Sequence, residues 1–395
     1  MKRIHWLIMG ISLIVLASCQ SKPGKLEPIY KTELVETKKI TLPVDENTYY
    51  LSKSMFHFEE NGKEYLSFGN APKRQYVEEI VVFDLNTNDV HMRIPLKKEG
   101  PDGVLAVFGC RPYHNLNNYI LFQHNVGQTT IINSQGEVQK RYIIKTSEGG
   151  LMQNTICSFY YIPSFIKDSI VYFHQDNVSQ NMKKDDWTKR SIFACMDLRN
   201  GSIGLLPLFY PTVFSQNVKN PADGYHFSYD YNMKDNRLVC AFCGYDSLMV
   251  TEDMKTVRWY DGKSRYLKKM QPQIKEAGLG LNEIKKNKEE AGYLHVMYDK
   301  YRDVYYRFVE MPCELGPGEY PYDEPKAREF SVIIFDKDFR IIGETKFPGN
   351  KYFYKMSFIG RDGLYISENN EANPEFDENK LVFACFGLQE LENNN

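Results

Sequence analysis

The most regular feature of the sequence is an apolar segment, a short polar turn and a second apolar segment, repeated along the chain. Hairpins of this form begin at Ile80, Thr130, Ile192, Leu248 and Val332. Val, Ile, Tyr and Phe dominate their segments, whereas Asn, Asp and Gly are common in their turns. This composition is typical of β-hairpins. The pattern therefore predicts strands along most of the chain.

Another apolar strand precedes each of these hairpins, so that each repeating unit holds at least three strands. These preceding strands are expected at 64–70, 118–124, 169–175, 237–243 and 304–311. A sixth pair, 363–370 and 380–388, ends the chain without a following outer strand. The segment 30–44 near the N-terminus has the composition to supply it. We therefore expect the two ends of the chain to pair.

The spacing of the units predicts a repeat architecture. They recur about every 60 residues, somewhat more than a propeller blade needs, which indicates blades with insertions. Blades bury both faces against their neighbours, and this explains how so many apolar strands fit in one fold. The sequence predicts an all-β, six-bladed β-propeller closed by the N- and C-terminal strands, as one domain over 29–395. Five or seven blades, a β-sandwich and two β domains are the alternatives.

One insertion differs in composition from the strands. Residues 264–292 include LNEIKKNKEEA, which is rich in Lys and Glu and free of Gly and Pro, and this predicts a short helical insertion. The following segment 313–325 is acidic and rich in Pro and Gly, so it is expected to be a loop.

The N-terminus has the pattern of a processing signal. Lys2 and Arg3 precede an apolar stretch too short to cross a bilayer comfortably. Leu-Ala-Ser-Cys at 16–19 resembles the bacterial lipobox, in which small residues precede a cysteine that carries lipid. We therefore expect residues 1–18 to be a signal peptide and Cys19 to be the site of diacylglycerol and palmitate attachment. An ordinary secretory peptide is the alternative reading.

The expected cellular location follows from that anchor. Residues 19–28 are polar with Pro and Gly, which is typical of a flexible tether. Two or three acyl chains hold a protein stably on a membrane, so the expected partner is a membrane reached through the N-terminal lipid. The SKPGK sequence lacks an acidic cluster that would resemble a surface-export signal. We expect a cell-envelope protein on the periplasmic face of the outer membrane.

Charge and motifs exclude several classes of function. Lys and Arg number 49 against 51 Asp and Glu, so nothing indicates a nucleic-acid partner.

Most cysteines lie inside apolar runs, as small buried hydrophobes do. Cys240 and Cys243 match CxxC, but residues three apart on a strand face opposite sides. No metalloprotease, hydrolase or nucleotide-binding motif is present, so we predict no cofactor, metal or catalytic residue.

Three segments together resemble a known family. KKEGPDGV at 97–104, SRYL at 264–267 and MYDKYRDVYYRFVEM at 297–311, with the lipobox, are similar to a family of Bacteroidetes propeller-like lipoproteins of unknown function. The resemblance covers nearly the whole mature chain. It implies a six-bladed fold and an envelope location, and no established reaction.

Propellers bind ligands where loops and inner strands meet at the central channel, and two clusters have suitable residues. The first is FGCRPYHNLNNYILFQH, in which Arg111, Tyr113, His114 and His124 are candidates. Arginine offers a planar fork for carboxylates, and histidine titrates near neutral pH. A loop with a hydrogen-bonded core histidine is the alternative.

The second cluster is YDKYRDVYYR. Its candidates are Asp299, Arg302, Tyr305 and Arg307, and Arg265 is expected to join Arg307 on the channel side. Arginine would bind an anion and tyrosine would stack on a sugar or ring. The structural alternative has Asp299 and Arg302 closing a turn and Arg307 pairing with a carboxylate between blades.

These features lead to two functional hypotheses. The first is a non-catalytic propeller that binds an envelope protein or a small ligand. The alternative is a hydrolase or lyase acting on a glycan or a lactone-like substrate, which rests on analogy with other propellers.

The lipid anchor is directly testable. Cys19→Ala removes the thiol that accepts the lipid, so the variant is expected to leave the membrane fraction when cells are fractionated. Continued membrane association of the variant would contradict the lipoprotein assignment.

Overall fold

The computed structural model describes residues 26–392, and the statements below concern these residues. Within that range it leaves undescribed residues 49–50, 73–75, 124–126, 145–157, 176–190, 214–226, 271–280, 283–284, 286–288 and 321–324. The predicted signal peptide and the predicted lipid site Cys19 lie outside the described residues.

Four sheets each consist of four strands that follow one another in the sequence. The first holds β2 (Leu51–Glu60), β3 (Lys63–Asn70), β4 (Glu79–Asp84) and β5 (Asp89–Pro95). The second holds β6 (Val107–Tyr113), β7 (Asn115–Gln123), β8 (Gln128–Asn133) and β9 (Val138–Ile143). The third holds β10 (Phe165–Lys167), β11 (Ile170–His174), β12 (Phe193–Asp197) and β13 (Ile203–Leu205). The fourth holds β14 (Phe227–Asn232), β15 (Arg237–Phe242), β16 (Ser247–Thr251) and β17 (Arg258–Asp261).

A fifth sheet has eight strands in two runs of four. One run is β18 (Gly292–Asp299), β19 (Val304–Glu310), β20 (Phe330–Phe335) and β21 (Ile341–Phe347). The other is β22 (Phe353–Gly360), β23 (Gly363–Ser367), β24 (Lys380–Glu390) and β1 (Thr32–Pro43). The runs meet where β1 is parallel to β21, at the single register pair Thr32 and Gly343. We call the six four-stranded runs units 1 to 6, with β1 as the outer strand of unit 6.

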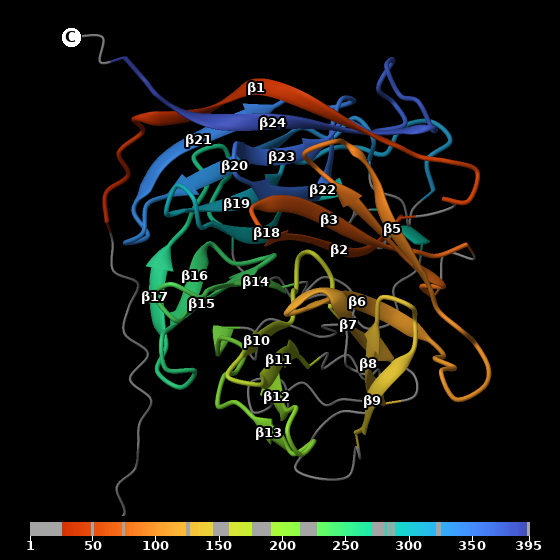
Figure 1. Ribbon diagram of the computed structural model, residues 1–395. Helices are drawn as coiled ribbons and strands as arrows, with labels where there is room; N and C mark the ends of the chain where they lie inside the picture. The colour runs from red at the N-terminus through yellow and green to blue at the C-terminus, as the bar shows by residue number, and fades with distance from the viewer. Residues whose placement is uncertain are drawn as a thin grey trace, which may run out of the picture.

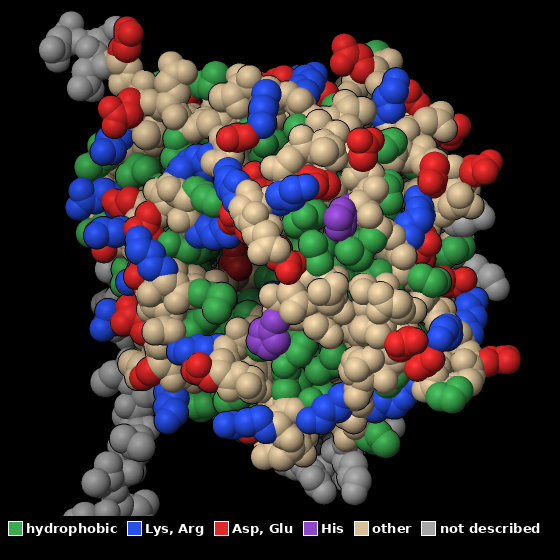
Figure 2. Space-filling view, viewed as in Figure 1, with side chains coloured by type: hydrophobic (Ala, Val, Ile, Leu, Met, Phe, Trp, Pro, Cys, Tyr) green, Lys and Arg blue, Asp and Glu red, His purple; other side chains and the backbone are tan. Residues whose placement is uncertain are grey.

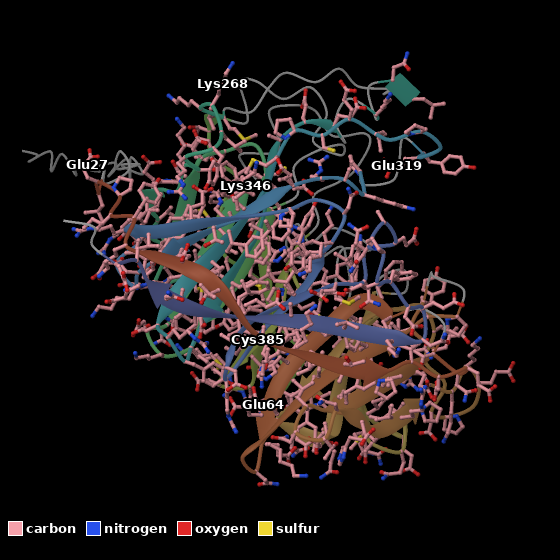
Figure 3. All side chains as sticks on the ribbon, turned by 90° about the horizontal axis from the view of Figure 1, so that it is seen from above. Glu27, Glu64, Lys268, Glu319, Lys346 and Cys385 are labelled. Carbon is pink, nitrogen blue, oxygen red and sulfur yellow. The ribbon has the colours of Figure 1, made fainter. Side chains whose placement is uncertain are left out.

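The two ends of the chain pair as the sequence predicts. β1 is antiparallel to β24 from Thr32 opposite Glu390 to Pro43 opposite Lys380, with a bulge between Glu36 and Lys38. Figure 3 shows β1 lying along β24 near Cys385. The first strand of the described chain therefore completes the last unit.

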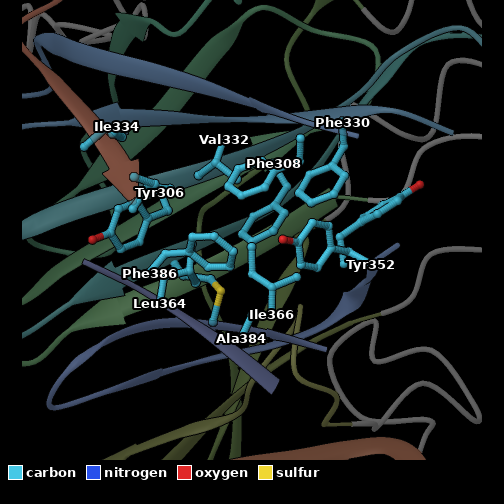
Figure 4. Packing of buried hydrophobic residues seen from close by; sticks show 14 of the residues in the cluster. Tyr306, Phe308, Phe330, Val332, Ile334, Tyr352, Leu364, Ile366, Ala384 and Phe386 are labelled. Atoms are coloured by element: carbon cyan, nitrogen blue, oxygen red, sulfur yellow. The ribbon is translucent and has the colours of Figure 1, made fainter. Parts of the chain in front are cut away.

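Side-chain packing joins each unit to the next. Each of the six buried apolar clusters found among the described residues combines side chains of two successive units. Figure 4 shows the cluster between units 5 and 6, where Phe308 and Phe330 face Ile366 and Phe386. Another cluster packs Phe383 of unit 6 on residues of unit 1, so the succession of units returns to its start.

The arrangement is all-β and propeller-like. In Figure 1 the first strands of the units, such as β6, β14 and β22, lie towards the middle, and the fourth strands β5, β9 and β17 lie towards the outside. The predicted second, third and fourth strands are all present. The apolar pattern of the sequence does not predict the innermost strands β2, β6, β10, β14, β18 and β22.

Aspartates fix the outer hairpins that the sequence predicts. Asp84 Oδ1 accepts the N–H of Asn86 at 2.8 Å, and Asp197 Oδ1 accepts that of Arg199 at 2.9 Å. Asp336 Oδ1 does the same with the N–H groups of Asp338 and Arg340. A short carboxylate that binds the backbone two residues further on holds the chain in a turn, and this explains why the residue type recurs at strand ends.

The predicted helical insertion lies mostly outside the described residues. Residues 264–267 form a turn and bend, and Leu281, Asn282, Lys285 and Glu289 are helical. Among the described residues, no helix is long and apolar enough to cross a membrane.

Closure by β1 makes a prediction about stability. Leu42 is fully buried in the cluster between units 6 and 1. Leu42→Ala should lower the free energy of unfolding by about 2–5 kcal/mol, because it leaves a cavity at the closing strand. The measurement is denaturant unfolding, with Thr41→Ala, at an exposed position of the same strand, as the control expected to cost less than about 1 kcal/mol. Equal losses in the two variants would contradict the closure.

Candidate functional site: the central channel

The innermost strands are held to each other by side chains. Ser54 of β2 donates its hydroxyl to the carbonyl of Cys110 on β6 at 2.7 Å and accepts the N–H of the same residue. Ser228 of β14 likewise accepts the N–H of Val296 on β18 at 2.8 Å. Neighbouring innermost strands belong to different units and do not pair with each other. Short polar side chains therefore form hydrogen bonds with the backbone groups that this edge leaves unpaired. The channel wall is therefore polar as well as aromatic.

Residues 158–164, which precede β10, cross the middle of this ring of strands (Figure 1). Tyr160 donates its N–H to the carbonyl of Lys53 on β2, and Tyr161 accepts the N–H of Tyr229 on β14. A Cβ at Gly109 would lie 2.5 Å from the carbonyl oxygen of Ser158, so the close approach to β6 requires a glycine. This segment therefore packs against the innermost strands β2, β6 and β14.

His295 lies beside this segment, on β18. It is 2% exposed, stacks on Phe308 at 4.1 Å and meets the Tyr160 ring edge-on at 5.4 Å. Burial, with a smaller effect of Lys355, lowers the pKa of His295 to about 3, so the ring is neutral at pH 7. Its Nε2 atom is buried without a hydrogen-bond partner. Such an atom is unusual in a folded protein and marks the place as one to explain.

Arg111 of β6 lies further along the channel. Its guanidinium carbon is 4.8 Å from the centre of the Phe56 ring, which is three residues beyond Lys53 on β2. The residue is half-buried, and its Nε is buried without a hydrogen-bond partner among the described residues. Burial lowers the pKa of Arg111 to about 10, which leaves the group charged at pH 7. A half-buried cation on β6 therefore has one buried donor, Nε, without an acceptor in the described part of the chain.

Asp230 of β14 supplies the opposite charge. Its Oδ1 accepts the N–H of Tyr231 and its Oδ2 accepts the N–H of Tyr298 on β18, both at 2.8 Å. Burial raises the pKa of Asp230 to about 6, while the two backbone hydrogen bonds and the charge of Arg111 oppose that rise. Arg111 and Asp230 thus affect each other electrostatically, yet they form no ion pair.

The surface is hollowed near the level of these inner strands. Figure 2 shows a deep recess in the middle of this face, with an acidic side chain at its base and apolar side chains around it. The candidate site is the group of side chains on and beside the innermost strands that consists of Phe56, Arg111, Tyr160, Asp230 and His295.

The first sequence cluster is only partly brought to this site. Arg111 is on the innermost strand β6, but the Tyr113 ring lies tilted against the His114 ring, with centroids 4.0 Å apart, at the end of the hairpin. His114 is exposed at the tip of that turn, with a φ of 67°. His124 lies outside the described residues.

Arg307 has a structural role. It is fully buried on β19, where Nη1 donates to the carbonyls of Asp246 and Gly262 and Nη2 to that of Tyr245. Its guanidinium carbon lies 3.6 Å from the centre of the Tyr293 ring. Arg307 therefore binds the loops of unit 4 to unit 5, and its partners are carbonyls rather than the expected carboxylate.

The rest of the second cluster closes a turn and fills the core. Asp299 is fully buried and accepts the N–H groups of Tyr301 and Arg302 and the Arg302 Nη1 at 2.7 Å. Tyr305 is fully buried, and its hydroxyl accepts the amide of Asn232 at 3.0 Å. These contacts correspond to the turn that the sequence analysis gave as the structural alternative.

Arg265 lies at the outer edge and not on the channel side. It is exposed, donates to the carbonyl of Glu344 on β21 at 2.7 Å, and its guanidinium carbon is 4.7 Å from the centre of the Tyr30 ring. The expectation that it joins Arg307 at the channel was wrong, because the turn at 264–267 packs on the outer strand of unit 5.

Sequence reasoning missed Phe56, Tyr160, Asp230 and His295, which together form most of the candidate site. All of them lie on or beside innermost strands, which mix polar and aromatic residues and so lack the apolar runs of the other strands. The available signal was the position of the innermost strands, since each of them lies one tight turn before a predicted apolar strand.

Cysteine and metal chemistry have no visible place in this site. Over the described ranges, no group of three His, Cys, Asp or Glu side chains is arranged to hold a metal ion. The cysteines that the structure describes form no disulfide, and burial raises the pKa of the Cys240 thiol well above its usual value.

Comparison with known proteins identifies the family of the chain. The model of a family described as a domain of unknown function, DUF4221, matches residues 31–346. The chain belongs to this family. A solved DUF4221 structure from Bacteroides vulgatus is 53% identical, with a TM-score of 0.85 over 91% of this chain and 99% of that one. No curated protein matches.

A more distant structure shares the fold alone. A candidate exported protein from Bacteroides fragilis is 10% identical, with a TM-score of 0.50 over 94% of this chain and 98% of that one. The DUF4221 assignment therefore rests on the family match and on the Bacteroides vulgatus structure.

The role of Arg307 can be tested by removing its charge. Arg307→Met should lower the free energy of unfolding by about 3–5 kcal/mol, because it leaves several buried carbonyls without a donor. Denaturant unfolding measures this loss, and Arg258→Met, at an exposed position of β17, should stay within about 0.5 kcal/mol. A small effect of Arg307→Met would return this residue to the list of ligand-binding candidates.

Proposed function

We propose that this protein is a cell-envelope lipoprotein whose six-bladed propeller binds a small ligand in its central channel without chemically changing it. Cys19 attaches the body to the periplasmic face of the outer membrane through lipid and a flexible tether. The lipobox-like sequence at 16–19 supports the anchor. The six four-stranded units, each packed on the next, support the blade count.

The observation that carries ligand binding is the guanidinium of Arg111. Leaving a buried donor without an acceptor costs free energy, and folded proteins rarely do so; the Nε of the half-buried Arg111 is such a donor. Arg111 has one aromatic contact, with Phe56, and no acceptor among the described residues. A ligand that brings an acceptor would recover that cost, so the channel is suited to an anionic group.

Binding without reaction is supported by how the channel groups are placed. Nucleophilic and general base catalysis need a reactive side chain in hydrogen-bond contact with its base, and a third group that orients the base. Within the described channel, the Nε2 of His295 contacts neither a hydroxyl nor a carboxylate, and Asp230 accepts two backbone N–H groups. These groups resemble a recognition site more than catalytic machinery.

The test is ligand capture by the full-length, lipidated protein in detergent. The protein is incubated with a small-molecule extract of the cell envelope, separated by gel filtration and denatured, and the released compounds are identified by mass spectrometry. The wild type should release at least one compound that Arg111→Ala does not. Arg199→Ala, an exposed arginine paired with Asp197 on an outer hairpin, is the matched control and should behave as the wild type.

Two results would contradict the proposal. If Arg111→Ala releases the same compounds as the wild type, the ligand is not bound in the channel. If the captured compound turns into products on prolonged incubation with the wild type, the protein is an enzyme.

A further inference from the structure

We infer that one outer edge of the protein is a docking surface for the anionic phospholipid membrane that holds the predicted lipid of Cys19. Three segments form this edge: the start of the described chain at 26–31, the turn at 263–269 and the last described residues 389–392. We call it the docking edge. The inference rests on the proposed function, since it needs the lipid anchor, and it adds which side of the body faces the membrane.

Hydrogen bonds and ring contacts bring the three segments together. Leu391 donates its N–H to the carbonyl of Lys31 at 2.8 Å, so the two ends of the described chain lie side by side. The guanidinium carbon of Arg265 is 4.7 Å from the centre of the Tyr30 ring and 4.9 Å from that of the Tyr266 ring. In Figure 1 the start of the described chain, the end of β17 and the end of β24 lie on one side of the molecule. These contacts make the docking edge one continuous surface.

Large apolar side chains gather on the docking edge. They are Leu26, Ile29, Tyr30, Tyr266 and Leu391, each between 36% and 45% exposed. Single exposed hydrophobic residues are ordinary on a protein surface, but a group of them marks a contact site. A tyrosine has an apolar ring and a polar hydroxyl, which suits the boundary between lipid headgroups and acyl chains.

The turn of the docking edge is strongly basic. Its exposed basic residues are Lys263, Arg265, Lys268 and Lys269, and Figure 3 shows Lys268 at the border of the molecule. No aspartate or glutamate lies between Gly262 and Met270. The other two segments hold Glu27, Glu390 and Glu392, so the positive charge is concentrated at the turn. Lysine and arginine next to apolar side chains lay their stems on the apolar surface and extend their charged ends to lipid phosphates.

The length of the tether indicates that the docking edge lies nearest the membrane. Cys19 and Leu26 are seven residues apart, which span at most about 25 Å when fully extended and about 15 Å as a flexible coil. A folded body of this length has a radius of gyration of about 21 Å, so the body is wider than the tether is long. The side where the tether joins the body is therefore held close to the lipid. Attraction between basic side chains and anionic lipids acts over about 8–10 Å, which is comparable with that separation.

Contact through the docking edge keeps the candidate site away from the membrane. β1, β17 and β21 are the outer strands of their units, so the docking edge belongs to the rim of the molecule and not to the innermost strands. A body that rests on its rim presents neither end of the ring of units to the lipid. A small ligand can therefore approach Arg111 and His295 from the aqueous side.

The experiment measures whether Tyr266 reaches the bilayer. Full-length lipidated protein that carries Tyr266→Trp is reconstituted in vesicles of two parts phosphatidylcholine and one part phosphatidylglycerol, with or without bromine near the top of the phosphatidylcholine acyl chains. Bromine quenches tryptophan on contact, so the fluorescence that the substitution adds over the wild type should fall by at least about half. Tyr320→Trp, at an exposed position of the loop 313–325, is the matched control and should lose less than about a tenth.

Two adjacent lysines test the part played by charge. In the Tyr266→Trp protein, the double change Lys268→Gln and Lys269→Gln should reduce the quenching by at least about half, because it weakens the attraction to anionic lipid. The double change Lys97→Gln and Lys98→Gln removes the same charge from exposed positions after β5 of unit 1 and should leave the quenching unaltered. Vesicles of phosphatidylcholine alone should quench Tyr266→Trp no more than the lysine-depleted turn does.

The outcomes separate this inference from the proposed function. Mass spectrometry of the intact protein shows whether Cys19 carries lipid, and its absence would overturn the anchor and this inference together. With the lipid present, an unquenched Tyr266→Trp would overturn this inference and leave the anchor and the channel ligand standing. Full quenching in the Lys268→Gln and Lys269→Gln protein would overturn it as well. Gel filtration in detergent tests the other occupant, since a dimer that Tyr266→Glu dissociates would assign the docking edge to a second copy of this chain instead.

Discussion

The pairing of β1 with β24 is the contact on which the rest of this structure depends. The units pack on each other mainly through side chains, with a few backbone hydrogen bonds such as that from the Tyr293 N–H to the carbonyl of Cys243, so each is positioned by its two neighbours. Units 1 and 6 would each lack one neighbour if the succession stayed open. β1 completes unit 6 along its full length. At its start it also meets β21 of unit 5, where the Thr32 hydroxyl donates to the carbonyl of Ile342. β1 therefore contacts three successive units, namely units 5 and 6 through strand pairing and unit 1 through the cluster that contains Leu42.

Closure has a consequence at the centre of the molecule. The outer strands of a unit satisfy their backbone groups by ladders, but the innermost strands have one edge without a neighbouring strand. Ser54, Ser228 and Asp230 satisfy backbone groups across this edge by side-chain hydrogen bonds. Polar groups are thus required in the channel wall for structural reasons alone, and a binding site needs only one or two more of them. In the proposed site Asp230 has a structural and a binding function, because its two backbone contacts use half of its acceptor positions and leave the other half for a ligand.

The difference between outer and inner strands explains how much the sequence could predict. The outer hairpins have apolar strands and an aspartate or asparagine that closes the turn, as at Asp84 and Asp197, so their positions could be read directly. The closing pair of strands followed from the strand missing at the C-terminus. The inner strands could not be found in this way, because the channel-facing residues break the apolar pattern. Most of the candidate site was missed for the same reason, and Arg111 was found because it lies in a segment with tyrosine and histidine and offers a planar fork for carboxylates.

Arg111 and Arg307 show why residue type alone does not identify a binding residue. Both lie against an aromatic ring, Phe56 in one case and Tyr293 in the other, and burial lowers the pKa of each to about 10. Arg307 has backbone carbonyls on both of its terminal nitrogens, so its charge is compensated within the protein. Arg111 has the ring and no acceptor. The pKa shift and the aromatic contact are alike for the two residues, but Arg307 is fully buried and Arg111 is half-buried, and the oxygen atoms around them differ. The arginine whose acceptors are missing is the one that a ligand can complete.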